Sequence, residues 1–294
     1  MYKINNMTLE NKASNGVKIQ GVIHMHSTYS YDGKENLLSL RDFLSGKGIS
    51  FCCLTEHTDY MTVEQAQRFA QECKALSTGT FLFIPGFEVP YKVNAKGREG
   101  ALGCKEAHIL LIGTEVFLGQ KADGEMLRKW SASSVLTILA HPVRNSFIVD
   151  EIMEDVLDGV EIWNQQYEGK RVPRVRSVRL LEKLQKKNPE LLATGGLDFH
   201  RKDHFGSPLF TLQLPMLTSY GVLEALKKGM YTFGTDAVSV SSVGIWKGNT
   251  HFYYRMQSFA SIAVIVCGKK VNAGLAYFGI KFPKKLTQLI RSRV

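Results

Sequence analysis

The segment GVIHMHSTYSYDG, residues 21–33, places His24 and His26 one residue apart and follows them with Asp32 in a turn rich in Ser, Tyr and Gly. Imidazole nitrogens and carboxylate oxygens are common ligands of transition-metal ions in proteins. The chain contains eight histidines, so a single His-x-His pair can arise by chance. Whether this pair belongs to a metal site therefore depends on where the other histidines fall.

Seven short apolar runs recur along the chain at intervals typical of strands that alternate with helices. Amphipathic helical stretches lie between several of them, as at residues 61–76 and 174–187. This alternation predicts parallel strands in an α/β fold, and seven strands predict a TIM-like (β/α)7 barrel that is closed or nearly closed. The predicted strands are residues 17–26, 49–57, 80–89, 108–116, 135–142, 159–164 and 191–200.

The ends of these predicted strands are rich in side chains that can bind a metal ion or a substrate. Barrels of this type carry their chemistry at the carboxyl ends of the strands. Six of the eight histidines lie at strand ends, which scattered core or surface histidines would have no reason to do. We interpret their joint occurrence as a metal site. The polar residues at the strand ends are His24, His26, His57, Glu88, His108, His141, Asn164, Asp198 and His200.

Strand geometry predicts which of these side chains point the same way. Side chains alternate between the two faces of a strand, so His24 and His26 should share a face, as should Asp198 and His200. Imidazole and carboxylate ligands without thiolate favour zinc, manganese or iron over a cysteine-rich structural zinc site.

Two glutamates receive different roles in this interpretation. Glu56 and His57 are neighbours and must point apart, so we assign His57 to the inside of the barrel and Glu56 to a supporting or surface role. A carboxylate can bridge two cations, which a neutral imidazole does poorly. Glu88 is the natural candidate for such a bridge.

At this point the sequence resembles a known family. The segments HMHSTYSYDG, LTEHTD, PGFEV, HILLIG, AHP and GLDFH, in that order, are similar to the polymerase and histidinol phosphatase (PHP) superfamily of metal-dependent hydrolases. The resemblance covers residues 18–236 and implies a distorted seven-stranded barrel with two or three divalent metal ions. The ending GLDFH…FGSP is also similar to the carbaryl-hydrolase-like branch, whose chemistry is carbamate hydrolysis.

The resemblance implies a set of nine metal ligands, all of them competent residues in this chain. The first ion would be held by His24, His26, Glu88 and Asp198. Glu88 would bridge to a second ion, held also by His108 and His141. The third ion would be held by Asp32, His57 and His200.

This ligand set predicts a metal-dependent phosphoesterase that acts on a small phosphorylated molecule or a nucleotide. Two cations about 3.5–4 Å apart lower the pKa of a bridging water and hold the attacking and leaving oxygens. The expected reaction is attack of metal-bound hydroxide on phosphorus at a multinuclear site. Glu88 and Asp198 would be catalytic through the metal ions. His204 could protonate the leaving group, and a surface role for it fits the sequence equally well.

Basic residues after the sixth predicted strand indicate where a phosphate could bind. Residues 164–187 contain eight basic and two acidic residues. Lys170, Arg171 and Arg174 would lie near a helix N-terminus on the active-site face, and Arg98 follows the third predicted strand. A solvated basic helix face is the alternative for this segment.

Charge separates the chain into two predicted parts. Residues 237–294 contain nine Lys or Arg and no acid, which leaves 28 basic and 27 acidic residues in the first 236. We predict a metallohydrolase barrel at 18–236 and a basic C-terminal extension at 237–294. The extension could bind an anionic membrane surface or nucleic acid, or simply pack on the barrel. The oligomeric state is not indicated by the sequence.

Cysteine usage and the polar N-terminus predict a cytoplasmic protein. The five cysteines are odd in number and form no Cys-x-x-Cys pair, which is typical of reduced thiols. Two alternative functions stay open besides the phosphoesterase. One is hydrolysis of a carbamate, amide or ester, and the other is a non-enzymatic accessory role at a membrane surface.

Overall fold

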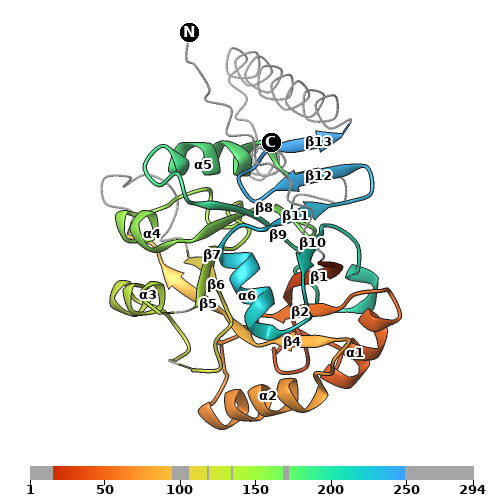
Figure 1. The fold of residues 1–294 in the computed structure, drawn as a ribbon. Coiled ribbons are helices and arrows are strands. Elements are labelled where there is room, and N and C mark those ends of the chain that lie inside the picture. Colours follow the sequence, from red (N-terminus) through yellow and green to blue (C-terminus); the bar gives the residue numbers. More distant parts are fainter. Residues whose placement is uncertain (1–15, 95–105, 118, 134, 168–171, 249–294) are drawn as a thin grey trace, which may run out of the picture.

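The computed structural model describes residues 16–94, 106–117, 119–133, 135–167 and 172–248 (Figure 1). In these ranges the chain is an α/β fold, as predicted, with two β-sheets and their helices around a common hydrophobic core. The helices are α1 (Leu37–Ser45), α2 (Val63–Leu76), α3 (Gly124–Ser131), α4 (Glu151–Val156), α5 (Val175–Gln185) and α6 (Ser219–Lys227), with a 3-10 turn η1 (Lys202–His204).

The strands divide between two sheets. One sheet has the order β13-β12-β11-β10-β1-β2-β4, with strands β13 (Trp246–Gly248), β12 (Val238–Ser241), β11 (Tyr231–Gly234), β10 (Leu209–Leu214), β1 (Val17–Met25), β2 (Phe51–Leu54) and β4 (Leu82–Ile84). The other has the order β3-β5-β6-β7-β8-β9, with strands β3 (Glu56–His57), β5 (Gly86–Lys92), β6 (Glu106–Ile112), β7 (Leu136–Leu139), β8 (Gly159–Asn164) and β9 (Leu192–Gly196).

The prediction of seven parallel strands is wrong for β6. This strand runs antiparallel to both β5 and β7, and no closed barrel is found among the described strands. A parallel pair needs a long crossover between its strands, usually a helix, whereas an antiparallel pair does not. The sequence predicts no helix at residues 93–105, between β5 and β6, which is consistent with the antiparallel pairing of these two strands. The reversal has a consequence for the site, because the first residues of β6 lie at the same end as the last residues of parallel strands.

The two sheets are joined along the chain and by hydrogen bonds. Only Thr55 separates β2 from β3, and only Pro85 separates β4 from β5, so each of these chain paths passes from one sheet to the other. On the opposite side, the amide of Leu197 donates to the carbonyl of Ile23 at 3.1 Å, and the amide of His26 donates to the carbonyl of Phe199 at 2.9 Å. The ends of β1 and β9 are therefore held together.

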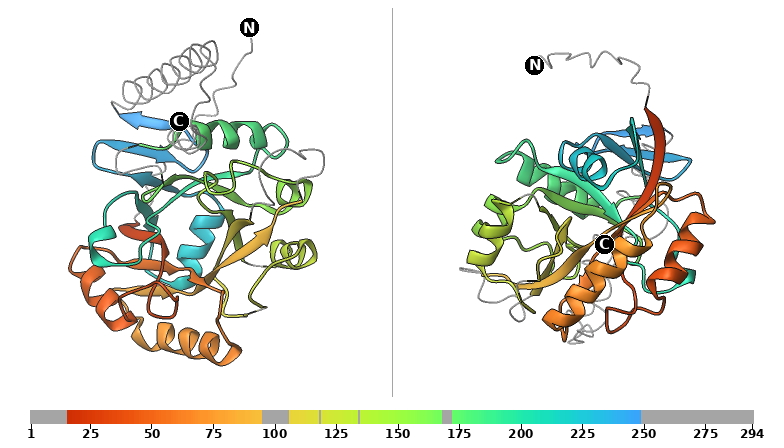
Figure 2. Two further views of the ribbon diagram at one scale, coloured as in Figure 1. Left: turned by 180° about the vertical axis from the view of Figure 1, so that it is seen from behind. Right: turned by 60° about the horizontal axis from the view of Figure 1, so that its bottom comes forward.

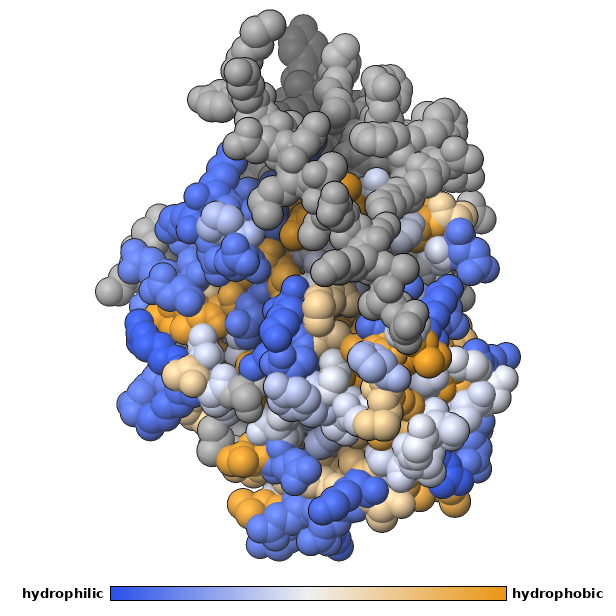
Figure 3. All heavy atoms as spheres, in the orientation of Figure 1, coloured by the Kyte–Doolittle hydropathy of each residue, from blue (hydrophilic) through white to orange (hydrophobic). Residues whose placement is uncertain are grey.

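The helices cover the sheets with their apolar faces, as their sequence periodicity predicts. In α2, Thr62 and Gln65 form a capping box, and Phe69 and Cys73 are among the residues buried against the core. The outward face of the molecule near α2 is largely hydrophilic (Figure 3). Helices α1 and α2 lie beside one another next to β4, whereas α3 and α4 pair next to β7 on a different side (Figures 1 and 2).

The predicted division at residue 236 falls between two paired strands. β12 pairs antiparallel with β11, and β13 pairs with β12, so residues 238–248 continue the first sheet. The rest of the predicted extension lies outside the described residues. In the part of the chain that the structure describes, none of the helices has both the length and the apolar character needed to cross a membrane.

Candidate metal centre

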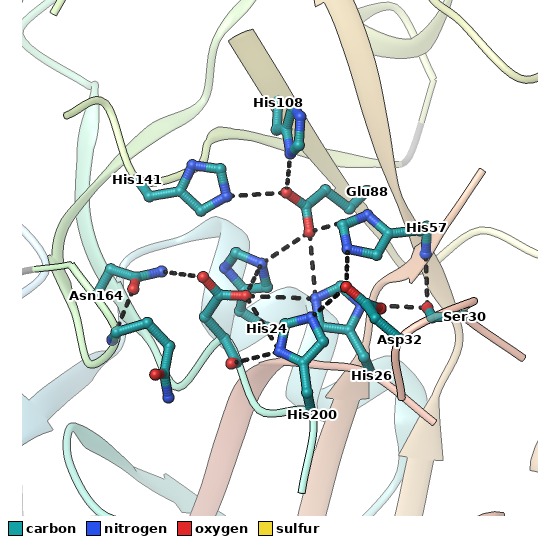
Figure 4. A network of polar contacts seen from close by, with 12 residues as sticks. His24, His26, Ser30, Asp32, His57, Glu88, His108, His141, Asn164 and His200 are labelled. Atoms are coloured by element: carbon teal, nitrogen blue, oxygen red, sulfur yellow. Dashed lines mark hydrogen bonds and ion pairs between the residues drawn. The ribbon is translucent and has the colours of Figure 1, made fainter. Parts of the chain in front are cut away.

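All nine predicted ligand residues lie together at one end of the strands, with Glu88 at their centre (Figure 4). Oε2 of Glu88 lies 3.0 Å from Nε2 of His24, 3.2 Å from Nε2 of His26 and 3.6 Å from Nδ1 of His57. Oε1 of the same carboxylate lies 2.9 Å from Nε2 of His141 and contacts Nδ1 of His108. One carboxylate thus contacts two groups of imidazoles, as a bridging ligand would.

The first predicted ligand group is compact. His24, His26, Glu88 and Asp198 are all buried, and each offers a ligand atom within 4.8 Å of the others. Oδ1 of Asp198 lies 3.6 Å from Nε2 of His24 and 3.7 Å from Nε2 of His26. These four side chains enclose a space that a single ion can occupy.

Two further groups of potential ligands overlap with the first, and His57 belongs to both of them. His57, Glu88 and His108 form one group, and His26, His57 and His200 form the other. Oδ2 of Asp32 lies 3.2 Å from Nε2 of His200 and 3.6 Å from Nε2 of His57, at the more exposed side of the cluster. The resemblance placed His57 only with Asp32 and His200, so the geometry adds a second neighbourhood for this imidazole.

His108 lies at the cluster because β6 is antiparallel. Residue 108 is near the start of β6, and it pairs with Pro90 of β5. In a parallel strand that position would be at the far end from His57 and His141. The reversed direction of β6 therefore supplies a ligand that a parallel strand could not supply from the same residue.

The backbone departs from regular strand geometry at three of the ligands. His24, Asp198 and His141 have positive φ angles of 61°, 49° and 22°. The pairing of β1 with β2 shifts between Ile23 and Met25, so His24 is the extra residue of a bulge. His24 and His26 point the same way, as predicted, since both contact Oε2 of Glu88, but the bulge and not the simple strand period brings them together. Non-glycine residues with such angles cluster at functional sites.

Comparison with protein families identifies the domain that carries this cluster. Residues 23–209 match the model of the PHP domain. The chain belongs to the PHP family. This agrees with the resemblance noted in the sequence.

One solved structure shares the fold at low sequence identity, and a second has a lower TM-score. A two-domain protein from Bacteroides vulgatus, described as containing a predicted PHP-like metal-dependent phosphoesterase, is 15% identical, with a TM-score of 0.54 over 77% of this chain and 67% of that chain. PsfC from Pseudomonas syringae is 9% identical, with a TM-score of 0.45 over 70% of this chain and 88% of that chain. No curated protein matched the chain.

Hydrogen bonds outside the predicted ligand set orient the imidazoles of the PHP domain. The carboxylate of Glu56 is buried and accepts from Ser27 Oγ at 2.6 Å and from Ser30 Oγ at 2.5 Å. Ser30 Oγ in turn accepts from the amide of His57 at 2.9 Å and lies 3.2 Å from Nδ1 of His26. Glu56 therefore supports the site and is not a surface residue.

The sequence interpretation missed Glu161. This fully buried residue lies in the middle of β8, and its Oε1 lies 2.8 Å from Nδ1 of His24. The only signal in the sequence was an acidic residue within an otherwise apolar strand. Asn164, which ends the same strand, donates to Glu161 and lies 3.4 Å from Oδ2 of Asp198.

Opposite charges shift the pKa values throughout the cluster. Burial opposes the charged form of both histidines of the pair, yet Glu161, Asp198 and Glu88 hold the pKa of His24 well above its usual value. Asp198 and Glu88 raise the pKa of His26 to about 9 against the same effect of burial. The histidines in turn hold the pKa of Glu88 and of Asp198 below the usual range, although burial acts in the other direction. The carboxylates of Glu88, Glu161 and Asp198 thus favour positive charge within the cluster, whether on the imidazoles or on a bound cation.

The donor set fits divalent metal ions. Nε2 of His26 and Nδ1 of His57 are buried and have no hydrogen-bond partner among the described residues. Nε2 of His26 lies 3.2 Å from Oε2 of Glu88 without the alignment of a hydrogen bond, so both atoms can direct lone pairs at a common point. Buried polar atoms are rarely left without partners, and a shared cation would satisfy these.

A cavity of about 450 Å³ opens beside the cluster. It is lined by the predicted ligands Asp32, His57, Asp198 and His200, by the aromatic residues Tyr31 and Tyr167, and by Lys34, Arg144, Gln166, Arg201 and His204. The predicted proton donor His204 is therefore at the site, where its Nε2 accepts a hydrogen bond from Nε of Arg201 at 3.0 Å. Burial, with Arg201 as the next cause, lowers the pKa of His204.

Of the four predicted substrate contacts, only Arg174 belongs to the described residues. Lys170, Arg171 and Arg98 lie outside the described residues. Arg174 is the N-terminal capping residue of α5 and is not among the described residues that line the cavity. The described cations there are Lys34, Arg144 and Arg201, which the sequence interpretation did not select.

Proposed function

We propose that this PHP-domain protein hydrolyses a phosphate ester of a small molecule or a nucleotide, with two or three divalent ions of zinc, manganese or iron. The observation that carries the proposal is the buried ligand cluster around Glu88, which opens into a cavity lined, among the described residues, by three cationic side chains. The Bacteroides vulgatus structure, described as containing a predicted PHP-like metal-dependent phosphoesterase, shares the fold and supports the same reading.

The ligand residues would divide among the ions according to their groups. His24, His26, Glu88 and Asp198 would hold one ion. The other side of Glu88, with His108 and His141, would hold a second, and Asp32, His57 and His200 would hold a third. When bound, these ions supply Lewis acidity and lower the pKa of a coordinated water.

The other side chains of the cavity would bind and orient the substrate. Lys34, Arg144 and Arg201 carry positive charge at the cavity wall and would bind phosphate oxygens. Tyr167 places its ring centroid 5.1 Å from that of His141, and the guanidinium of Arg144 lies 5.8 Å from the centre of the Tyr167 ring. Tyr167 would thus hold Arg144 beside the metal ligands.

His204 can donate a proton from Nε2 only after Arg201 releases that nitrogen. In the structure Nε2 accepts from Arg201, so the neutral imidazole carries its hydrogen on Nδ1. Once a phosphate binds Arg201, Nε2 would be free to take up a proton from solvent, and the resulting imidazolium could give that proton to the leaving oxygen. We therefore propose that Arg201 and His204 act in turn, the first on the substrate and the second on the departing oxygen.

The test is a substrate panel with the full chain, purified without chelator and analysed for metal content. We expect two or three ions per chain and metal-dependent hydrolysis of phosphate mono- or diesters. Carboxyl esters, amides and carbamates serve as the comparison, because the carbaryl-hydrolase-like resemblance predicts activity on them instead. Metal content near zero that added zinc or manganese cannot raise would overturn the proposal, as would hydrolysis of carbamates alone.

A further inference from the structure

Glu161 connects residues of two predicted ligand groups. Its Oε1 lies 2.8 Å from Nδ1 of His24, in the first group. Its Oε2 accepts the backbone amide of His141, in the second group, at 2.7 Å, and the side-chain amide of Asn164 at 2.9 Å. Both oxygens of one fully buried carboxylate therefore accept hydrogen bonds from residues of the cluster or beside it.

The neighbouring strand is built to admit this carboxylate. Gly196 of β9 pairs with Asn164 of β8. A Cβ atom at Gly196 would overlap Oε1 of Glu161 and would lie 2.7 Å from Cβ of His24. The absence of a side chain at this position leaves room for the contact between Glu161 and His24, which is an observation independent of the hydrogen bonds.

The contact determines which nitrogen of His24 can bind a metal. An ionised carboxylate only accepts hydrogen bonds, so Nδ1 of His24 carries the hydrogen and Nε2 keeps its lone pair. Nε2 is the atom that faces Glu88 and Asp198. His26 has a separate support, because Ser30 gives its only hydroxyl hydrogen to Glu56 and accepts from Nδ1 of His26.

The second contact supports the backbone of His141. This residue has a φ of 22°, a conformation that L residues rarely adopt. The hydrogen bond from its amide to Glu161 is buried and long-range, so it can hold the chain in that conformation. Nε2 of His141 then reaches Oε1 of Glu88 at 2.9 Å.

We propose that Glu161 is a positioning residue that orients His24 and His141 together and so couples the two ligand groups on either side of Glu88. The inference rests on the proposed metal centre, but it does not depend on which ester is hydrolysed. Groups that orient metal ligands typically change metal affinity by about 10- to 100-fold when they are replaced.

Glu161→Gln is the informative variant because it keeps the shape and removes one acceptor. If its amide nitrogen faces His24, two donors meet, and the imidazole must move its hydrogen to Nε2, which then cannot bind metal. If its amide oxygen faces His24, the amide nitrogen opposes the backbone N–H of His141. Either orientation therefore damages one ligand group.

The experiment measures binding of zinc alone to the metal-depleted full chain, by competition with a chromophoric chelator. We expect Glu161→Gln to lower zinc affinity about 10- to 100-fold relative to wild type. In the zinc-bound protein, the ¹⁵N shifts of the imidazoles should show an altered hydrogen position on His24 if the amide nitrogen faces it, and an unchanged one on His26 in either orientation, which serves as an internal control. Glu161→Asp keeps both acceptors and should recover part of the affinity.

A matched variant separates positioning from stability. Asp150 is also a buried carboxylate, and it accepts from Tyr91 Oη at 2.8 Å and from the amide of Met153 at 2.9 Å, away from the cluster. Asp150→Asn should lower the unfolding temperature and leave zinc affinity unchanged. Wild-type zinc affinity in Glu161→Gln, or equal losses in the two variants, would overturn the inference. Failure of the wild-type chain to bind zinc or manganese would instead overturn the proposed function.

Discussion

Glu88 is the residue on which the proposed centre depends most, because its two oxygens contact imidazoles on both sides. Glu88→Gln removes the negative charge that would balance two cations and replaces one acceptor with a donor. We expect metal affinity to fall by more than about tenfold and activity to fall with it, while the far-UV circular dichroism stays that of the wild type. Metal titration and a steady-state assay check this.

The control for this variant is Glu182→Gln, a substitution at an exposed position on α5. It removes the same charge from the protein without touching the cluster, and both affinity and activity should stay at the wild-type level. A folded Glu88→Gln protein with full activity would contradict the bridging role.

The raised histidine pKa values predict that metal uptake releases protons. A pKa of about 9 for His26, raised by Asp198 and Glu88, means that its imidazole is largely protonated near neutral pH when no metal is bound. A metal ligand must be neutral, so the ion displaces this proton. Metal affinity should therefore increase as the pH rises from about 6.5 to about 9, and the number of protons released per ion should fall.

The same linkage has an opposite sign for the stability of the metal-free protein. A pKa that is higher in the folded state than in the unfolded chain adds stability below the unfolded value of 6.5, and this stability is lost as the pH rises through about 9. Calorimetric titration of manganese in buffers of different ionisation enthalpy measures the protons, and denaturant unfolding measures the stability. Buffer-independent heats across this range would contradict the prediction.

At the scale of the elements, the turn after β7 supplies both a predicted ligand and a cation. The amide of Arg144 donates to the carbonyl of His141 at 2.9 Å. This tight turn holds the backbone of Arg144 close to that of His141. We expect Arg144→Ala to raise KM for a phosphate ester by about tenfold or more, since hydrogen bonds to charged groups contribute about 1.5–3 kcal/mol. Metal content should not change, because Arg144 is not a ligand.

Steady-state kinetics with elemental analysis checks this, with Lys129→Ala as the control on the exposed surface of α3. Arg171→Ala and Arg174→Ala belong in the same series, because the basic segment after β8 predicts that they bind phosphate as well. An unchanged KM in Arg144→Ala would show that the substrate phosphate does not bind at the turn after β7.

At the scale of the whole molecule, the charge is concentrated in the C-terminal part of the chain. Residues 237–294 hold nine basic residues and no acid. Segment 283–294, PKKLTQLIRSRV, combines basic residues with Leu286, Leu289 and Ile290 at helical spacing. We predict that the full chain binds vesicles of anionic lipid more strongly than neutral vesicles, since each Lys or Arg near such a surface contributes about 1 kcal/mol.

Sedimentation with the two kinds of vesicle at low salt tests this, and a chain that ends at Gly248 is the control. That end point keeps β12 and β13, which belong to the first sheet. Equal pelleting of both chains, or of neither, would contradict the prediction. If the full chain binds nucleic acid and the shortened chain does not, nucleic acid would be favoured over a membrane surface as the partner of the basic extension.

The sequence by itself determined which residue types could bind metal ions and at which positions of the chain they occur. Metal ions require particular donor atoms, so His24, His26, Glu88 and Asp198 are recognisable as residue types wherever the fold places them. The alternation of apolar runs with amphipathic stretches likewise predicted α/β structure, because a local period reflects which side of an element is buried.

Only the tertiary structure decided how these pieces meet. Strand direction depends on pairing between segments, and the antiparallel course of β6 that brings His108 to the cluster leaves no mark in its own periodicity. The left-handed backbone at His24 is a property of the bulge between β1 and β2. Glu161 contacts a histidine 137 residues away, and Arg144 reaches the cavity through a turn, so neither role follows from sequence spacing. Local patterns report burial, whereas contacts between distant residues exist only once the sheets have formed.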